Sequence, residues 1–167
     1  TLLVTQSAWG ATLSSNGGDI SASATYDLTG NITPTNVWII KKGATVIVNL
    51  NGKILNGNGA RRLFHIESGA SLTINGPGTL TNCSSANGGA IYVYNGGTLT
   101  LNKCEITENK ATTNGGAIYA EGTGSKLIIN EGTKITKNTA TSAGGGIWCT
   151  NIDINGTSSN KVIISDN

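Results

Sequence analysis

Gly88-Gly89-Ala90-Ile91 decides the fold, because the same short pattern returns twice further along the chain. It recurs 27 positions later as Gly115-Gly116-Ala117-Ile118, and after a further 29 positions as Gly144-Gly145-Gly146-Ile147. A second pattern, Ile-x-x-Asn, keeps step with the first and ends at Asn109, Asn138 and Asn167. Motifs that return together at a period of about 20–50 residues are typical of a stacked solenoid.

The repeat extends upstream with looser spelling. Residues 69–75 match residues 96–102 at an offset of 27, and residues 43–49 match residues 69–75 at an offset of 26. The resulting coils are 37–62, 63–89, 90–116, 117–146 and 147–167. We therefore expect an all-β protein, a right-handed single-stranded parallel β-helix of about five coils of roughly 26–29 residues, each too small to bury a face alone.

Each coil is expected to contain three short strands with alternating apolar residues, as in residues 90–95, 98–102 and 105–109. Alternation assigns one face of each strand to the core. For the first strand the inward residues are Trp38, Phe64, Ile91, Ile118 and Ile147. For the second strand they are Val46, Leu72, Leu99, Leu127 and Ile152.

The segment before residue 37 fits the repeat poorly. We expect residues 1–36 to form an N-terminal cap and an incomplete first coil, with Trp9 and Leu13 in the cap, because an open sheet edge needs covering. Residues 37–167 are expected to form the β-helix as a single domain. We also expect the chain to be a fragment of a larger protein, with flanking domains in the same polypeptide.

Composition argues against several functional classes. The chain has 167 residues, 24 glycines, 12% charged residues and a net charge of +2, so it has no basic footprint for nucleic acid. No apolar run approaches the roughly 20 residues that a membrane span needs. Three separated cysteines, Cys83, Cys104 and Cys149, and a single histidine predict neither a metal site nor a cofactor.

The outward residues of the first strand form the candidate binding face. The coil offsets align His65, Tyr92, Tyr119 and Trp148 in one column, with Tyr94 in the next column. Aromatic side chains that stack on an exposed face would suit sugar rings or a partner protein. The alternative is that the aromatic residues only stabilise the parallel strands.

An asparagine follows the second strand of every coil, at Asn49, Asn75, Asn102, Asn130 and Asn155. Stacked side-chain amides can hydrogen-bond to one another along a solenoid axis. We interpret this ladder, and the asparagines of the Ile-x-x-Asn motif, as structural.

The two recurring motifs, over residues 88–167, resemble the repeats of the polymorphic outer-membrane protein family, in which Phe usually stands where this chain has Ile. Upstream, residues 42–53 and 68–74 are similar to pectate-lyase-like β-helix regions of bacterial surface proteins. The resemblance implies a secreted, cell-surface and often adhesive protein. A likeness of fold and motif alone does not imply an enzymatic activity.

We therefore expect a non-catalytic, adhesin-like extracellular module that displays or binds a glycan or a protein on one face. One alternative is a polysaccharide lyase or hydrolase in which Glu67, Glu121 and either Lys41 or His65 perform acid/base chemistry. The other is a purely structural stalk.

Overall fold

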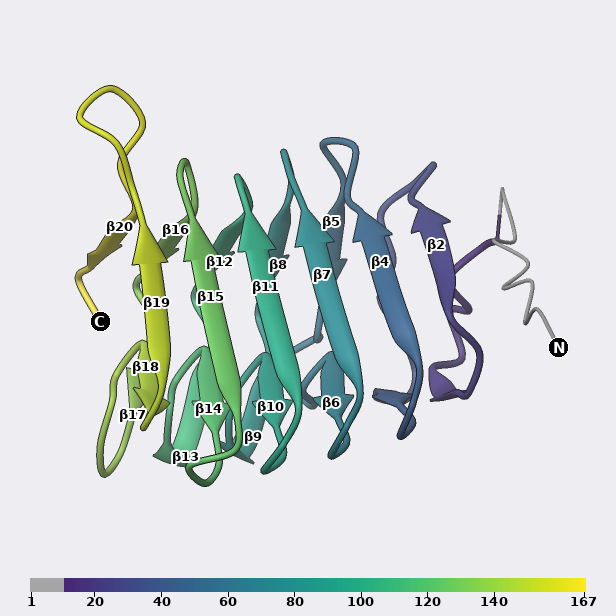
Figure 1. Cartoon of the computed structure of the whole chain (residues 1–167). Helices are drawn as coiled ribbons and strands as arrows, with labels where there is room; N and C mark the ends of the chain where they lie inside the picture. The colour runs from purple at the N-terminus through teal and green to yellow at the C-terminus, as the bar shows by residue number, and fades with distance from the viewer. Residues whose placement is uncertain (1–10) are drawn as a thin grey trace, which may run out of the picture.

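The computed structural model describes residues 11–167, and these residues form a parallel β-solenoid without helices (Figure 1). Every strand pair is parallel, and the strands stack in sheets that run the length of the molecule. This confirms the predicted all-β parallel β-helix of about five coils.

The first sheet carries the candidate face. It contains β1 (Gly18–Ile20), β3 (Trp38–Ile40), β6 (Phe64–Ile66), β10 (Ile91–Val93), β14 (Ile118–Ala120) and β18 (Ile147–Cys149). The second sheet contains β2 (Ala24–Asp27), β4 (Thr45–Asn49), β7 (Ser71–Asn75), β11 (Thr98–Asn102), β15 (Lys126–Asn130) and β19 (Ile152–Asn155). The third contains β5 (Ile54–Asn56), β8 (Thr79–Thr81), β12 (Glu105–Thr107), β16 (Lys134–Thr136) and β20 (Ile163–Ser165).

A fourth sheet was not expected from the sequence. It contains only β9 (Ser84–Asn87), β13 (Lys110–Asn114) and β17 (Thr139–Ala140). These segments are rich in Ser, Thr and Asn, and Ala111 is the one fully buried residue within them. Because backbone pairing rather than apolar alternation holds them, the pattern of side chains did not reveal them.

The core is a column of stacked aliphatic and aromatic side chains. In the first sheet Trp38, Phe64, Ile91 and Ile118 are at most 1% exposed, as the register predicts. In the second sheet the inward residues Val46, Leu72, Leu99 and Leu127 have no exposed surface, whereas Ile152, in the last strand of the sheet, is 36% exposed. Complete burial of such a side chain stabilises a fold by about 1.5–3 kcal/mol.

Before residue 37, β1 and β2 stack on β3 and β4, and Ile32 bridges to Leu55. Leu13 is buried, and the indole N–H of Trp38 donates a hydrogen bond to the carbonyl oxygen of Ser14 at 2.8 Å. Trp9 lies outside the described residues.

The glycine pair of the repeat has two different roles. The first glycine, as at Gly115, adopts a left-handed φ of +64° that glycine tolerates best. The second allows two coils to approach, since a Cβ on Gly116 would lie 1.9 Å from the carbonyl oxygen of Gly145. The motif that identifies the repeat is therefore the point where the backbone turns against the next coil.

Candidate binding face

The outward side chains of the first sheet line up as the offsets predict. Strand register aligns His65 with Tyr92, Tyr92 with Tyr119, and Tyr119 with Trp148. We call these four residues the aromatic column. All four are half-buried, while their immediate neighbours in each strand point into the core.

Within the aromatic column the rings stack on one another. Tyr92 and Tyr119 have centroids 5.4 Å apart and planes inclined by 7°, and Tyr119 and Trp148 are 4.6 Å apart at 16°. His65 meets Tyr92 edge-on, at 4.9 Å and 86°. Much of the ring-face area therefore contacts neighbouring rings.

Arg62 extends the column at its N-terminal end. Its guanidinium carbon lies 4.8 Å from the centroid of the Tyr92 ring, and its Nη2 donates a hydrogen bond to Ser85 Oγ at 2.6 Å. Burial lowers the pKa of Arg62. Arg61 instead donates to the carbonyl oxygen of Pro34 at 2.8 Å, so the two arginines do not act on the same group.

The neighbouring column contains charged residues that are already paired. Lys41 forms an ion pair and hydrogen bond with Glu67, and the backbone N–H of Lys42 donates to the same carboxylate at 3.1 Å. The Lys41 hydrogen bond is the main cause of the lowered pKa of Glu67. Glu121 accepts a hydrogen bond from the hydroxyl of Tyr92. The carboxylates of Glu67 and Glu121 thus stabilise the side chains of this face.

Tyr94 is the most accessible ring of the face, at 46% exposed. It lines a pocket of about 330 Å³ together with Lys42, His65, Glu67 and Ser68. The pocket therefore joins an exposed aromatic ring, a lysine and the end of the aromatic column.

His65 is the one titratable group of the aromatic column with an ordinary pKa near neutrality. Burial lowers its pKa, and the positive charge of Arg62 acts in the same direction. At neutral pH the ring is thus uncharged, and it contacts Tyr92 as an aromatic group.

Both asparagine ladders form hydrogen bonds between neighbouring coils. In the outer ladder each amide nitrogen donates to the oxygen of the preceding coil, for example from Asn102 to Asn75 at 2.7 Å and from Asn130 to Asn102 at 2.7 Å. The inner asparagine Asn109 is 1% exposed, accepts the backbone N–H of Cys83 at 3.0 Å, and donates to Asn138 at 2.9 Å.

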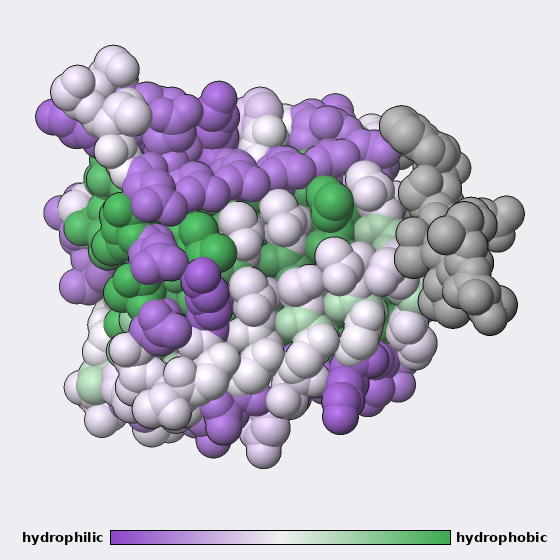
Figure 2. All heavy atoms as spheres, viewed as in Figure 1, coloured by the Kyte–Doolittle hydropathy of each residue, from purple (hydrophilic) through white to green (hydrophobic). Residues whose placement is uncertain are grey.

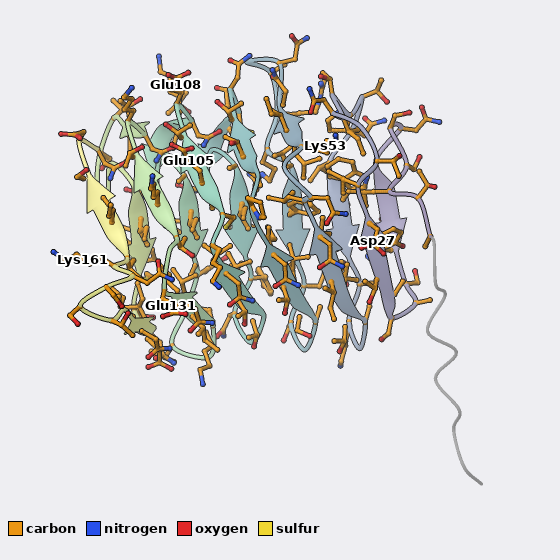
Figure 3. The ribbon with its side chains drawn as sticks, turned by 90° about the horizontal axis from the view of Figure 1, so that it is seen from above. Asp27, Lys53, Glu105, Glu108, Glu131 and Lys161 are labelled. Carbon is orange, nitrogen blue, oxygen red and sulfur yellow. The ribbon has the colours of Figure 1, made fainter. Side chains whose placement is uncertain are left out.

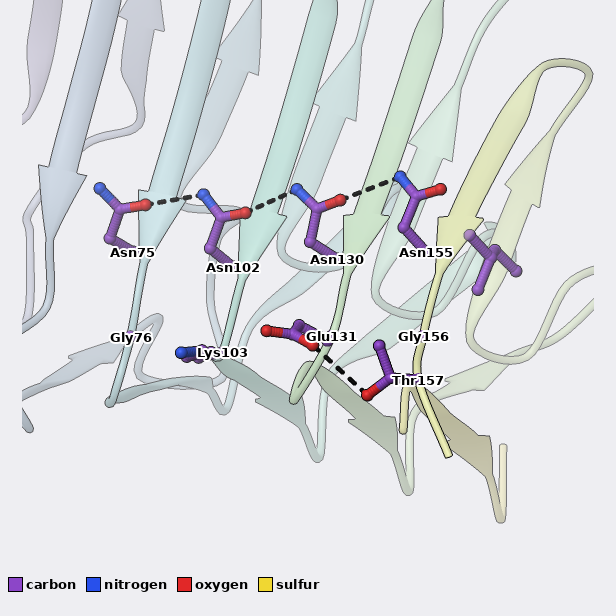
Figure 4. A pocket seen from close by; sticks show the side chains of 10 residues that line it. Asn75, Gly76, Asn102, Lys103, Asn130, Glu131, Asn155, Gly156 and Thr157 are labelled. Atoms are coloured by element: carbon purple, nitrogen blue, oxygen red, sulfur yellow. Dashed lines mark hydrogen bonds between the residues drawn. The ribbon is translucent and has the colours of Figure 1, made fainter. Parts of the chain in front are cut away.

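Sequence reasoning missed a groove beside the outer ladder. Its volume is about 820 Å³, and Lys103, Glu131 and Thr157 face the ladder across it (Figure 4). Each of these residues follows a ladder asparagine by one or two positions, and that regularity was available in the sequence. Alternation describes strands and not the turns after them, so it gave no reason to group these residues.

Among residues 11–167 there is no group of three or more His, Cys, Asp or Glu side chains arranged to hold a metal ion. The same residues include no helix long and apolar enough to cross a membrane. Cys83, Cys104 and Cys149 carry free thiols, and burial raises the pKa of both Cys83 and Cys104 to about 12.

Comparison with known families matches two segments, residues 103–121 and 132–150, to the Chlamydia polymorphic membrane protein repeat. Each segment runs from the turn before a strand of the third sheet to a strand of the first sheet or just beyond it, and includes both recurring motifs. Comparison with curated proteins and with solved structures gave no match. These two segments are therefore similar to the repeat of the polymorphic membrane proteins, a family of bacterial outer-membrane and surface proteins.

Proposed function

We propose that this chain is a non-catalytic module of a bacterial surface protein, located outside the cell, and that it binds an extracellular protein through the aromatic column. The observation that supports this most directly is the continuous stack of Tyr92, Tyr119 and Trp148 on one outward face. Tyr and Trp are enriched among the residues that dominate protein interfaces.

The rigidity of the stack favours binding. Neighbouring rings and Arg62 already hold Tyr92 and Tyr119 in place, so a partner orders few additional rotamers. Because the rings stack on one another, the surface presents mainly their edges beside the exposed Tyr94. Such a surface suits a protein better than a row of sugar rings, because sugars prefer free aromatic faces.

A glycan is the second candidate, and the pocket at Tyr94 favours it. This ring is exposed, and Lys42 and Ser68 bring polar groups to the same pocket. A single sugar residue could lie on Tyr94 without disturbing the column.

Acid/base catalysis by Glu67 and Glu121 has less support. A general acid must hold a proton near the operating pH, whereas the hydrogen bond from Lys41 lowers the pKa of Glu67. Glu121 accepts a hydrogen bond from Tyr92 and so has a structural partner. Release of reducing ends from a polysaccharide panel would instead favour the enzyme.

The test compares binding by the parent protein and by a Tyr94→Ala/Tyr119→Ala/Trp148→Ala variant. Both are applied to arrays of extracellular-matrix proteins and of glycans. A Glu105→Ala/Lys134→Ala variant, altered at one cross-strand pair on the third sheet, is the matched control. We expect the parent and the control to bind the same protein, and the aromatic variant to lose at least tenfold in affinity.

The outcomes separate the candidates. Binding confined to glycans and lost in Tyr94→Ala alone would favour the sugar pocket over a protein partner. Absence of binding by the parent on both arrays would contradict the proposal and favour a structural stalk. Circular dichroism and thermal unfolding establish that each variant remains folded.

A further inference from the structure

The outer asparagine ladder has unused hydrogen-bonding capacity. A side-chain amide has two N–H donors and an oxygen with two lone pairs. Each asparagine between the two ends of the outer ladder uses only one donor and one lone pair in the ladder. All its bonds point in the same direction, from the amide of Asn155 through successive coils to the carboxylate of Asp27. Each coil therefore has one donor and one acceptor left at the same place.

These free groups border the groove of about 820 Å³. Asn75, Asn102, Asn130 and Asn155 line one wall (Figure 4). That volume lies within the roughly 300–1,000 Å³ typical of small-molecule sites. In the space-filling view a hydrophilic band crosses the molecule along the ends of the second-sheet strands (Figure 2).

The opposite wall combines charged, polar and apolar groups. Lys103 and Glu131 supply one charge of each sign, and neither belongs to an ion pair among residues 11–167. The Thr157 hydroxyl donates to Glu131 at 3.5 Å, and Ile154, 52% exposed, adds apolar surface. The groove is therefore close to neutral overall and rich in hydrogen-bonding groups.

The spacing of the ladder selects the shape of the ligand. Neighbouring coils lie about 4.8 Å apart, so four amides span about 14 Å. A polysaccharide of 1,4-linked pyranose rings in an extended chain advances by about one coil spacing per ring. Its full repeat of two rings is close to two coil spacings. An extended peptide presents the same side every 6.8 Å or so, which matches neither one coil spacing nor two, so its backbone would not stay in step with the amides.

The chemistry of each coil agrees with the same ligand. Successive β-1,4-linked rings are turned over relative to each other, so alternate coils meet opposite edges of the sugar. One edge carries a pair of adjacent hydroxyl groups and the other carries a hydroxymethyl group beside the ring oxygen, and either set can accept from an amide N–H and donate to an amide oxygen. We propose that this groove binds an extended, uncharged, β-1,4-linked polysaccharide running along the solenoid axis, with one sugar residue per coil. This site is separate from the aromatic column and does not depend on its proposed role.

The experiment titrates the isotope-labelled protein with cellohexaose and mannohexaose and follows the side-chain amide signals by NMR. Maltohexaose, whose α-1,4 linkages curve the chain, is the control ligand. We expect the signals of Asn75, Asn102, Asn130 and Asn155 to shift with at least one β-1,4-linked hexasaccharide. The control ligand should bind at least tenfold more weakly.

Variants then locate the site without altering the ladder. Glu131→Ala/Thr157→Ala removes ligand contacts from the opposite wall and should weaken binding by roughly two- to twelvefold, the range for one lost hydrogen bond. The Tyr94→Ala/Tyr119→Ala/Trp148→Ala variant should bind the hexasaccharide as the parent does. Circular dichroism checks the fold of each.

The proposal is overturned if the ladder signals do not shift with either β-1,4-linked hexasaccharide at millimolar concentration. It is also overturned if the aromatic variant, but not the groove variant, loses binding, since the sugar would then occupy the aromatic face. Equal binding of maltohexaose would exclude an extended chain in step with the coils.

Discussion

At the scale of the residue, outward and inward positions of the same strand have different roles. Ile91 and Val93 are completely buried, while Tyr92 between them stacks on Tyr119 and donates a hydrogen bond to Glu121. His65 occupies the equivalent outward position in the preceding coil. The imidazole of His65 is therefore partly buried, in edge-on contact with an aromatic ring and close to the positive charge of Arg62.

These surroundings predict a pH effect on stability. Because the pKa of His65 is lowered below its ordinary value of 6.5, the unfolded chain binds this proton more readily than the folded one. Stability from this group is thus complete above pH 6.5 and declines as the pH falls toward the folded pKa. Denaturant unfolding between pH 7 and 5 should show the decline, and His65→Gln should lack it.

The only histidine of the chain makes the measurement direct. Proton NMR of the imidazole should give a pKa below 6.5 in the native protein. A measured value at or above 6.5 would contradict the account, because it would mean that Glu67 and Glu121 outweigh burial and the charge of Arg62.

At the scale of the element, the turn before each first-sheet strand determines how closely two coils stack. Gly116 has an ordinary backbone conformation, but its Cα faces the backbone of the next coil. A Cβ there would lie 1.9 Å from Gly145 O and 2.6 Å from Thr139 N. The requirement for glycine at this position is therefore steric.

We expect Gly116→Ala to reduce the free energy of unfolding by about 1–3 kcal/mol or more, as overpacking does in well-packed cores. Gly30→Ala is the matched control, because Gly30 also lacks a left-handed φ and no atom lies within 4 Å of its added Cβ. Urea unfolding followed by circular dichroism measures both. Equal stability of the two variants would show that neighbouring coils separate easily.

At the scale of the whole molecule, the two ends of the solenoid differ. Leu13, Ile20 and Leu28 are buried near the N-terminal end. At the other end β18, β19 and β20 are the last strands of their sheets, and apolar surface is visible there (Figure 2). Charged residues lie around the sides, with Glu108 and Glu131 on opposite sides (Figure 3).

This difference predicts that equivalent substitutions have unequal costs along the axis. Ile129 and Ile154 are register partners, but Ile129 is fully buried and Ile154 is 52% exposed. Ile129→Ala should cost about 2–5 kcal/mol of stability. Ile154→Ala should cost less than about 1 kcal/mol, since little packing is lost at an open surface.

Denaturant unfolding of the two variants tests this directly. Similar losses would indicate that something covers the terminal coil in solution. Dilution of the protein before unfolding then shows whether that cover is a second copy of the chain, since only self-association depends on concentration.

The sequence by itself determined the period, the register and the ladders. Residues 27 and 29 positions apart repeat the same pattern, so the alignment of Tyr92 with Tyr119 and of Tyr119 with Trp148 followed from counting. The same counting aligned Asn75 with Asn102. The alternation of apolar residues is a local property of each strand. In a solenoid each coil contacts only its neighbours, so this local pattern is enough to specify the contacts between coils.

Only the tertiary structure decided the rotamers of the side chains and the paths of the turns. Side-chain torsion angles stack Tyr119 on Trp148, and they direct Arg62 to Tyr92 while Arg61 reaches Pro34. The paths of the turns bring Lys103 and Glu131 opposite the ladder and form the groove. Apolar alternation specifies which face a residue occupies, but neither its rotamer nor the course of the chain between strands, so these features emerge only when coils pack together.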